Sequence, residues 1–365
     1  MYKICLAAGD ETTHRLDAIQ QRFSDIFREV ELFDGQLLED SVLQYHFIAF
    51  ENWTDKTHYT DPVDFIRAKL NEMINNGQHQ NAIIFIDKFS LRLKESFRII
   101  RDLLSNKSSP YRDLDCLNRM GSFYPILIKT YKLDETAGKS NFEKVCRFLE
   151  IFSFRVMAMG KSRSDAGQNP INLLARDFSG KYGKLFNELT LQINRLSNRK
   201  SFLDSLSNTQ FYEVIKSRDI SYLIWKYENS LRDYEQPVCS RMSEQEFMND
   251  TRNKQLTIEH IASQKSNSVV QDRAILSQLD HETLGQNLHR LGNLTFDPAS
   301  ANSSKSNHGI EIKNSKYFTK APYKTQNELE SFLVDGKWSI ESIVNREKKI
   351  INFCISYWSP ENIAY

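Results

Sequence analysis

Hydrophobic residues recur every three or four positions through most of the first 250 residues, and this spacing predicts a succession of amphipathic helices. The first stripe, in residues 14–33, contains Leu16, Ile19, Phe23, Ile26, Phe27 and Val30. Later stripes run through Val63, Ile66, Leu70 and Met73, through residues 81–104, through Leu185, Leu189 and Ile193, and through Ile220, Leu223, Ile224 and Tyr227. Strand-like alternation is scarce here, so this part of the chain is predicted to be a multi-helix region.

Capping residues mark some of the helix ends. Asp61-Pro62 suits a helix start, because proline is favoured at the first helical position. Ser140 and Glu143 have the spacing of a capping box before the next apolar run. Gly160 is then expected to end that helix.

The pattern changes near residue 245. Two short β-like pieces, residues 255–261 and 291–296, are separated by a polar loop of about 25 residues. Asp297-Pro298 is interpreted as a turn, followed by a short helix from near Ala301. A closing helix from about residue 339 carries Ile340, Ile343, Ile350 and Trp358. We therefore expect a mainly α protein with a helical scaffold or regulatory region over 1–245 and a second domain over 246–365.

Composition and charge exclude several classes of protein. The chain has 48 Lys and Arg against 47 Asp and Glu, so nucleic-acid binding would need a local basic patch rather than a global charge excess. The 5 cysteines form no CxxC pair, which argues against a disulfide scaffold and a zinc finger and favours a reducing cytoplasm. No apolar run approaches the ~18 residues of a membrane span, so no membrane partner is expected.

Four polar residues of the C-terminal part suggest phosphodiester hydrolysis. Glu259-His260 ends the first β-like piece, Asn293 lies on the second, and Asn302 follows on the predicted helix. A neutral histidine can accept a proton from water near neutral pH. Carboxylate and amide oxygens are hard ligands suited to Mg²⁺, which can neutralise charge on a reacting phosphate.

These residues fall within a longer motif that resembles a known nuclease family. Ile258-Glu-His-Ile261 with Gln264, then His289-Arg-Leu-Gly-Asn-Leu-Thr-Phe296, then Asn302, Ser306-Asn307 and Lys313 resemble the HNH domain of GmrSD-type modification-dependent restriction enzymes. The resemblance extends to Arg218, Tyr222-Leu223 and Glu228 upstream and to Trp338, Ile343, Arg346 and Trp358 downstream. More distantly, it includes Phe123-Tyr-Pro-Ile-Leu127, Leu149-Glu150 and Arg155.

The resemblance implies a ββα-metal fold and a metal-dependent DNA endonuclease of restriction or antiviral defence. It implies that His260 is the general base, that Glu259 and Asn302 bind Mg²⁺ or Mn²⁺, and that Asn293 braces the hairpin loop and orients the base. His289, Arg290, Lys305 and Lys313 become candidates for phosphate contact or scaffold support. The basic stretch 305–324, which includes Lys316, is expected to follow a phosphate backbone.

The chain also departs from that family. Glu259 stands where many HNH nucleases have aspartate, and the longer side chain shifts the expected metal position. The family's nucleotide-hydrolysing half is missing, since Asp34-Gly35-Gln36 is followed by two leucines and is interpreted as a turn. A separate nucleotide-hydrolysing regulatory protein is therefore an expected partner.

Three alternatives stay open. The chain can be a catalytically inactive DNA- or partner-binding subunit of a defence system that keeps the fold. His308 can replace Asn302 as a metal ligand, although it lies six residues further along the helix. RNA is a possible substrate, because the chemistry does not require a deoxyribose.

Overall fold

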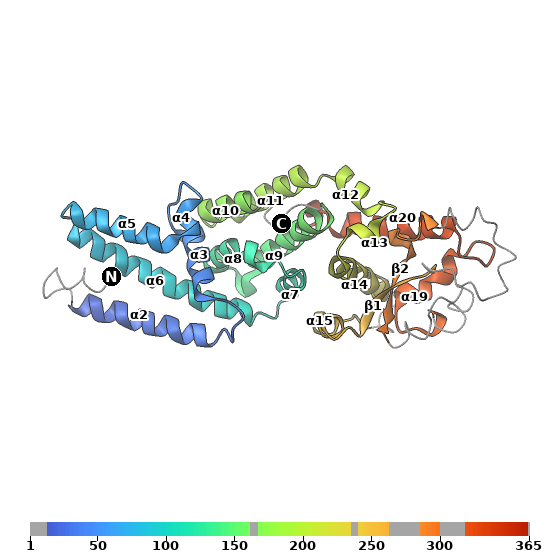
Figure 1. Cartoon of the computed structure of the whole chain (residues 1–365), viewed down its shortest axis with the longest axis horizontal. Helices are drawn as coiled ribbons and strands as arrows, with labels where there is room; N and C mark the ends of the chain where they lie inside the picture. The colour runs from blue at the N-terminus through green and yellow to red at the C-terminus, as the bar shows by residue number, and fades with distance from the viewer. Residues whose placement is uncertain (1–12, 161–166, 235–239, 263–284, 300–317, 364–365) are drawn as a thin grey trace. The chain divides into compact units, whose positions relative to one another are not determined.

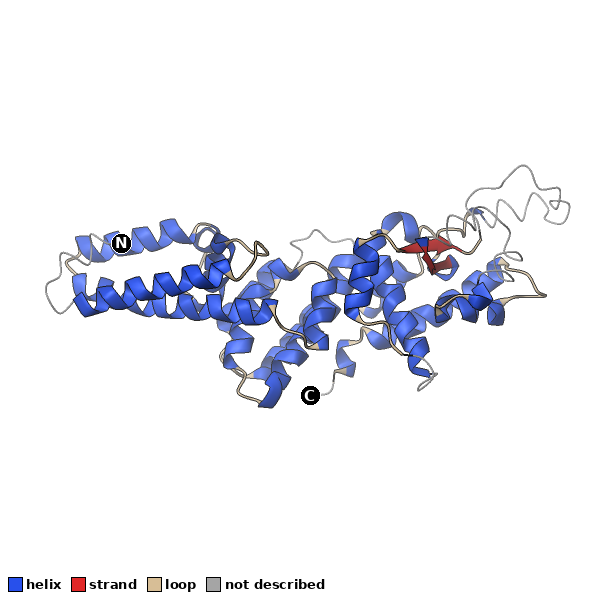
Figure 2. Cartoon of the chain, turned by 90° about the horizontal axis from the view of Figure 1, so that it is seen from below, coloured by secondary structure: helices blue, strands red, loops and turns tan. Residues whose placement is uncertain are grey.

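A computed structural model of the chain describes residues 13–160, 167–234, 240–262, 285–299 and 318–363. These residues are mainly helical, as predicted, and Figures 1 and 2 show one small pair of strands among the helices. The longer helices are α2 (Thr13–Glu31), α3 (Glu39–Phe50), α5 (Pro62–Asn75), α6 (His79–Leu104), α8 (Tyr124–Leu133), α9 (Ser140–Phe152), α10 (Gln168–Asp177), α11 (Tyr182–Leu196), α14 (Ser217–Tyr234), α15 (Glu244–Arg252) and α20 (Ile340–Tyr357). The shorter helices are α4 (Thr57–Thr60), α7 (Ser109–Cys116), α12 (Arg199–Leu206), α13 (Phe211–Val214) and α19 (Lys324–Asn327).

Packing divides the chain into two compact units. The first consists of Met1–Tyr111, Met120–Cys146 and Gly167–Glu188. The second consists of Arg112–Arg119, Arg147–Ala166 and Leu189–Tyr365. These units are defined by packing and not by function. The expected division into a scaffold or regulatory region over 1–245 and a second domain over 246–365 therefore stays a prediction.

In the first unit, α2 packs along α6, as Figure 1 shows. Ile19 and Ile26 of the predicted stripe are buried, whereas Phe27 is 66% exposed. Ion pairs connect the two helices at the edge of this apolar contact, with Arg22 Nη1 2.6 Å from an Asp87 carboxylate oxygen. The pattern therefore locates the helix and its buried side, with one position misassigned.

One predicted cap in the first unit is confirmed and one is wrong. Asp61 accepts a hydrogen bond from the backbone N–H of Asp64, three residues into α5. Ser140 instead has helical torsion angles, with φ −62° and ψ −31°, so it cannot be the N-cap of α9. The Asp134 carboxylate caps the helix instead, because it accepts a hydrogen bond from the backbone N–H of Phe142 at 2.7 Å.

Gly160 ends the helical stretch that α9 begins, as predicted. The chain continues from α9 into a π-helix over Ser153–Met159, and Gly160 follows it. A Cβ atom at Gly160 would lie 2.5 Å from the Val156 carbonyl oxygen, so a side chain does not fit there.

The second unit contains the two strands. β1 (Leu256–His260) pairs antiparallel with β2 (Leu294–Pro298). The first strand is where the pattern predicted it, but the second begins three residues later, because Leu291–Asn293 forms a 3₁₀ turn. The predicted turn at Asp297-Pro298 is wrong: Asp297 pairs with Thr257 and Pro298 ends the strand. Within the described residues the sheet has two strands, so there the missing N–H of the proline interrupts no further ladder.

Two expectations from the sequence concern membrane spans and the cysteines. Of the described helices, none has the length and apolar character to cross a bilayer. Cys116, Cys146 and Cys354 are free and buried, and burial raises the pKa of each thiol. These three cysteines are therefore inert packing residues.

Candidate functional site

The Glu259-His260 pair lies at the end of β1, as predicted. Both residues are buried, each with 8% of its surface exposed. In the strand register Glu259 is opposite Thr295 and His260 is opposite Leu294. Because successive side chains of a strand point to opposite faces, Glu259 shares a face with Thr257 and Thr295, while His260 shares the other with Ile258.

The His260 ring is held by two other rings. Tyr212, from α13, packs edge-on against it with centroids 4.5 Å apart, and the His289 ring lies at 5.5 Å and a right angle. Tyr212 is stacked against His289 at 6.0 Å, and its backbone N–H donates to the His289 carbonyl at 2.9 Å. The structure therefore brings His289 and His260 together and adds Tyr212, which the sequence analysis missed.

Asn293 is completely buried in the 3₁₀ turn before β2, rather than on the strand where it was expected. Its side-chain oxygen accepts the Ala262 N–H at 2.9 Å and the Trp338 indole N–H at 3.1 Å. Its amide nitrogen donates to the Leu288 carbonyl at 2.8 Å, and its own carbonyl accepts the Ile261 N–H. Asn293 thus ties the segment just after His260 to the turn before β2, and its expected role in orienting the base stays a prediction.

Gly292 lets this turn lie directly on α20. A Cβ atom there would be 2.0 Å from the Ile343 carbonyl oxygen and 2.9 Å from the Glu347 Cβ. No other residue fits without moving the helix backbone. The glycine is required for close approach, not for an unusual torsion angle.

Arg346 fixes the same turn from α20. Its guanidinium donates to the carbonyls of Gly292 at 2.9 Å and Leu294 at 2.7 Å, on either side of Asn293. It also donates to the Thr325 carbonyl at 3.2 Å and to a Glu328 carboxylate oxygen at 2.9 Å. One buried side chain therefore joins α20, the turn, β2 and α19.

Arg290 is also bound within the protein. Its guanidinium lies 2.6 Å from a Glu347 carboxylate oxygen and donates to the Asn287 side chain at 2.6 Å. Burial raises the pKa of Glu347, and the Arg290 charge opposes that rise. Of the two roles expected for Arg290, these contacts fit scaffold support, and contact with nucleic acid stays a prediction.

Asp297 is a buried carboxylate that the interpretation as a turn concealed. It lies opposite Thr257, on the Glu259 face of the strand pair, and accepts a hydrogen bond from Gln326 at 3.0 Å. Carboxylate oxygens are suitable donors for a hard divalent cation. In the described ranges, however, no three His, Cys, Asp or Glu residues gather as a metal cluster.

The remaining candidates lie outside the described residues. They are Gln264, Asn302, Lys305, His308, Lys313 and Lys316. The metal pair Glu259 and Asn302 and the basic stretch before residue 318 therefore stay predictions.

Comparison with protein families identifies the part of the chain that holds this site. Residues 196–353 match the family described as GmrSD restriction endonucleases, C-terminal domain. The matched segment includes Tyr212, both strands, the 3₁₀ turn and most of α20. No curated protein and no solved structure matches the chain.

Proposed function

We propose, from the match of residues 196–353 to the GmrSD restriction endonuclease C-terminal domain, that the chain is a metal-dependent HNH endonuclease that hydrolyses DNA phosphodiester bonds in restriction or antiviral defence. The observation that carries the proposal is the placement of His260 within the matched segment. Its ring is fixed by Tyr212 and His289, and the following residues are tied down by Asn293.

His260 acts in this proposal as the general base. A ring nitrogen of the neutral imidazole accepts a proton from the water that attacks phosphorus. The edge-on contact with Tyr212 restricts the ring orientation, which keeps that nitrogen directed at one position. Asn293 contributes by holding the backbone of Ala262, two residues after the base.

Glu259 and Asn302 would hold Mg²⁺ or Mn²⁺, through a carboxylate and an amide oxygen. The bound ion supplies charge neutralisation at the phosphate and at the departing oxygen. The donor chemistry fits a hard cation, and the buried Glu259 carboxylate is at the strand end where His260 lies. His289, Lys305, Lys313 and Lys316 are proposed to contact phosphates, and the His289 ring lies 5.5 Å from the His260 ring.

Plasmid cleavage tests the proposal. Supercoiled plasmid is incubated with the chain and Mg²⁺ or Mn²⁺, and parallel reactions contain EDTA. We expect nicking that EDTA abolishes and that His260→Ala lowers by roughly 10²–10⁴-fold, the usual contribution of a general base. His79→Ala removes an exposed histidine at the start of α6 and should cleave like the wild type.

The unfolding midpoint of His260→Ala is measured alongside its activity. Cleavage by His260→Ala at the wild-type rate, or cleavage unaffected by EDTA, would refute the mechanism. A wild-type chain that binds DNA and never cleaves it would favour the inactive binding subunit. Control by a separate nucleotide-hydrolysing protein stays a prediction.

A further inference from the structure

The second unit contains a cavity beside the proposed catalytic site. Its volume is about 760 Å³, and it is bordered by α13, α14, α15, the start of β1 and the end of α7. Tyr212 lines this cavity and also contacts the His260 ring. The cavity therefore lies beside the side chain that contacts His260. It is large enough for part of an extended ligand.

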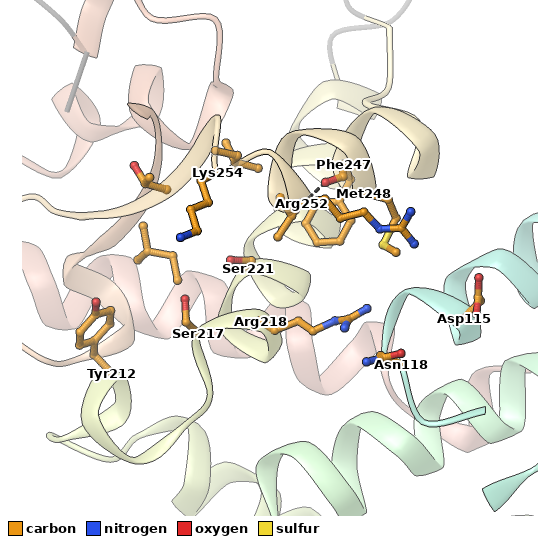
Figure 3. Close-up of a pocket in the computed structure, with 14 residues that line it drawn as sticks. Asp115, Asn118, Tyr212, Ser217, Arg218, Ser221, Phe247, Met248, Arg252 and Lys254 are labelled. Carbon is orange, nitrogen blue, oxygen red and sulfur yellow. Dashed lines mark hydrogen bonds between the residues drawn. The ribbon is translucent and has the colours of Figure 1, made fainter. Parts of the chain in front are cut away.

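Three cationic residues, Arg218, Arg252 and Lys254, line this cavity (Figure 3). Some of the Arg218 donors are already used, because its guanidinium donates a hydrogen bond to the Cys116 carbonyl at 2.9 Å. Arg252 and Lys254 are exposed, and neither makes an ion pair within the described part of the chain. The acidic lining residue is Asp115, which pairs with Arg112 at 3.1 Å.

Lys254 has an unusual backbone. It follows α15 with φ +54°, in the left-handed region where glycine is the favoured residue. Such a position costs an L-residue about 1 kcal/mol or more. A long cationic side chain therefore occupies a position that the local backbone does not favour.

We propose that Arg252 and Lys254 bind the phosphodiester backbone of the DNA duplex on one flank of the scissile bond. This inference rests on the proposed nuclease function and names a second contact surface for the same substrate. Six residues separate Lys254 from His260, so at most about 21 Å of extended chain joins them. At 3.4 Å per base pair, the phosphates that Lys254 contacts therefore lie within about six base pairs of His260.

The test compares two doubly substituted full-length chains. Arg252→Gln with Lys254→Gly removes the two cavity cations and relieves the left-handed backbone. Arg195→Gln with Lys348→Gln removes two exposed cations that do not line the cavity and make no ion pair among the described residues. Binding to a fluorescent 20-base-pair duplex is measured by anisotropy in EDTA, from 50 mM to 1 M salt. Plasmid cleavage is measured separately with Mg²⁺.

Each lost phosphate contact should lower the slope of log affinity against log salt by about 0.9. The cavity variant should therefore lose about 1.8 from the slope and bind about 60-fold more weakly at 0.1 M salt than the wild type. Its unfolding temperature should stay the same or rise, because glycine suits residue 254. The control variant should keep the wild-type slope.

The outcomes separate this inference from the proposed function. A cavity variant that binds like the wild type, or a control that weakens as much, overturns the inference while cleavage can persist. A wild-type chain that binds through these cations and cleaves nothing overturns the nuclease proposal alone. A wild-type chain that fails to bind the duplex at 50 mM salt overturns the inference as well.

Discussion

Arg346→Met is expected to destabilise the second unit far more than loss of any exposed cation. Only 1% of the Arg346 side chain is exposed. Methionine keeps the apolar part of the side chain but removes every donor. The carbonyls of Gly292 and Leu294 then lose a hydrogen bond in a buried place, and Glu328 loses its buried partner.

The magnitude follows from these contacts. Removing one partner of a buried ion pair costs about 3–5 kcal/mol, and each buried acceptor left without a donor costs about 1–3 kcal/mol. Water and the remaining partners of Glu328 will recover part of this loss. We therefore expect the free energy of unfolding to fall by about 4 kcal/mol, a large part of the ~5–15 kcal/mol of an ordinary domain.

Lys349 provides the matched control, because it is on the same helix and pairs with the same carboxylate at 2.8 Å. Its side chain is 47% exposed, so Lys349→Met should cost less than about 1 kcal/mol. Urea unfolding gives the two free energies, and hydrogen exchange in peptides over 256–262 and 291–298 locates the change. Equal losses in both variants, or a loss confined to exchange in the first unit, would refute this account of Arg346.

Three further perturbations have expected outcomes. Gly292→Ala should lower the free energy of unfolding by about 3 kcal/mol, because its Cβ would overlap the Ile343 carbonyl; an unchanged melting temperature would contradict this. Burial lowers the pKa of His46 to about 3 from 6.5, so the unfolded chain binds the extra proton and stability falls as pH drops below 6.5. The loss should reach about 2 kcal/mol at pH 5 and disappear in His46→Asn, and urea unfolding at pH 5 and 7.5 checks it. Asn302→Ala should raise the Mg²⁺ concentration needed for half-maximal cleavage, whereas an identical titration would assign the ligand role to another residue.

The helices could be predicted from the sequence because each buries one stripe at the helical period. Ile66 and Leu70 of the predicted stripe are buried on α5, whereas Val63 is 46% exposed. Periodicity shows which face of a helix is apolar, but it does not show how far along that face the neighbouring helix covers it. The same limit explains the false cap at Ser140, where the nearby Asp134 side chain binds the N–H instead.

The strand errors have a different origin. Asp297-Pro298 has the composition of a turn, but cross-strand pairing with β1 overrides that preference at the edge of a two-stranded sheet. The Leu-Gly-Asn segment could equally begin a strand from its composition. What decides its conformation is the close approach of α20 to Gly292, which local sequence does not contain.

Site residues that are neighbours in sequence could be predicted. Residues that only tertiary packing brings next to them could not. Glu259 and His260 lie at the strand end, as the motif predicted. Tyr212 comes from a four-residue helix, too short for any periodic signal, and reaches His260 only through the fold. Its position within the matched family segment was the available indication that this region belongs with the site.

A buried carboxylate connects α14 with the part of the chain that follows residue 245. Glu228, in α14, is completely buried and accepts the backbone N–H groups of Lys324 and Thr325 at the start of α19. A buried carboxylate needs such donors, because an unpaired one would lose its hydration without compensation. α19 also supplies Gln326 to Asp297 and the Thr325 carbonyl to Arg346. The chain from α14 to the turn before β2 is thus connected by buried polar contacts, and the network that supports His260 includes residues on both sides of residue 245.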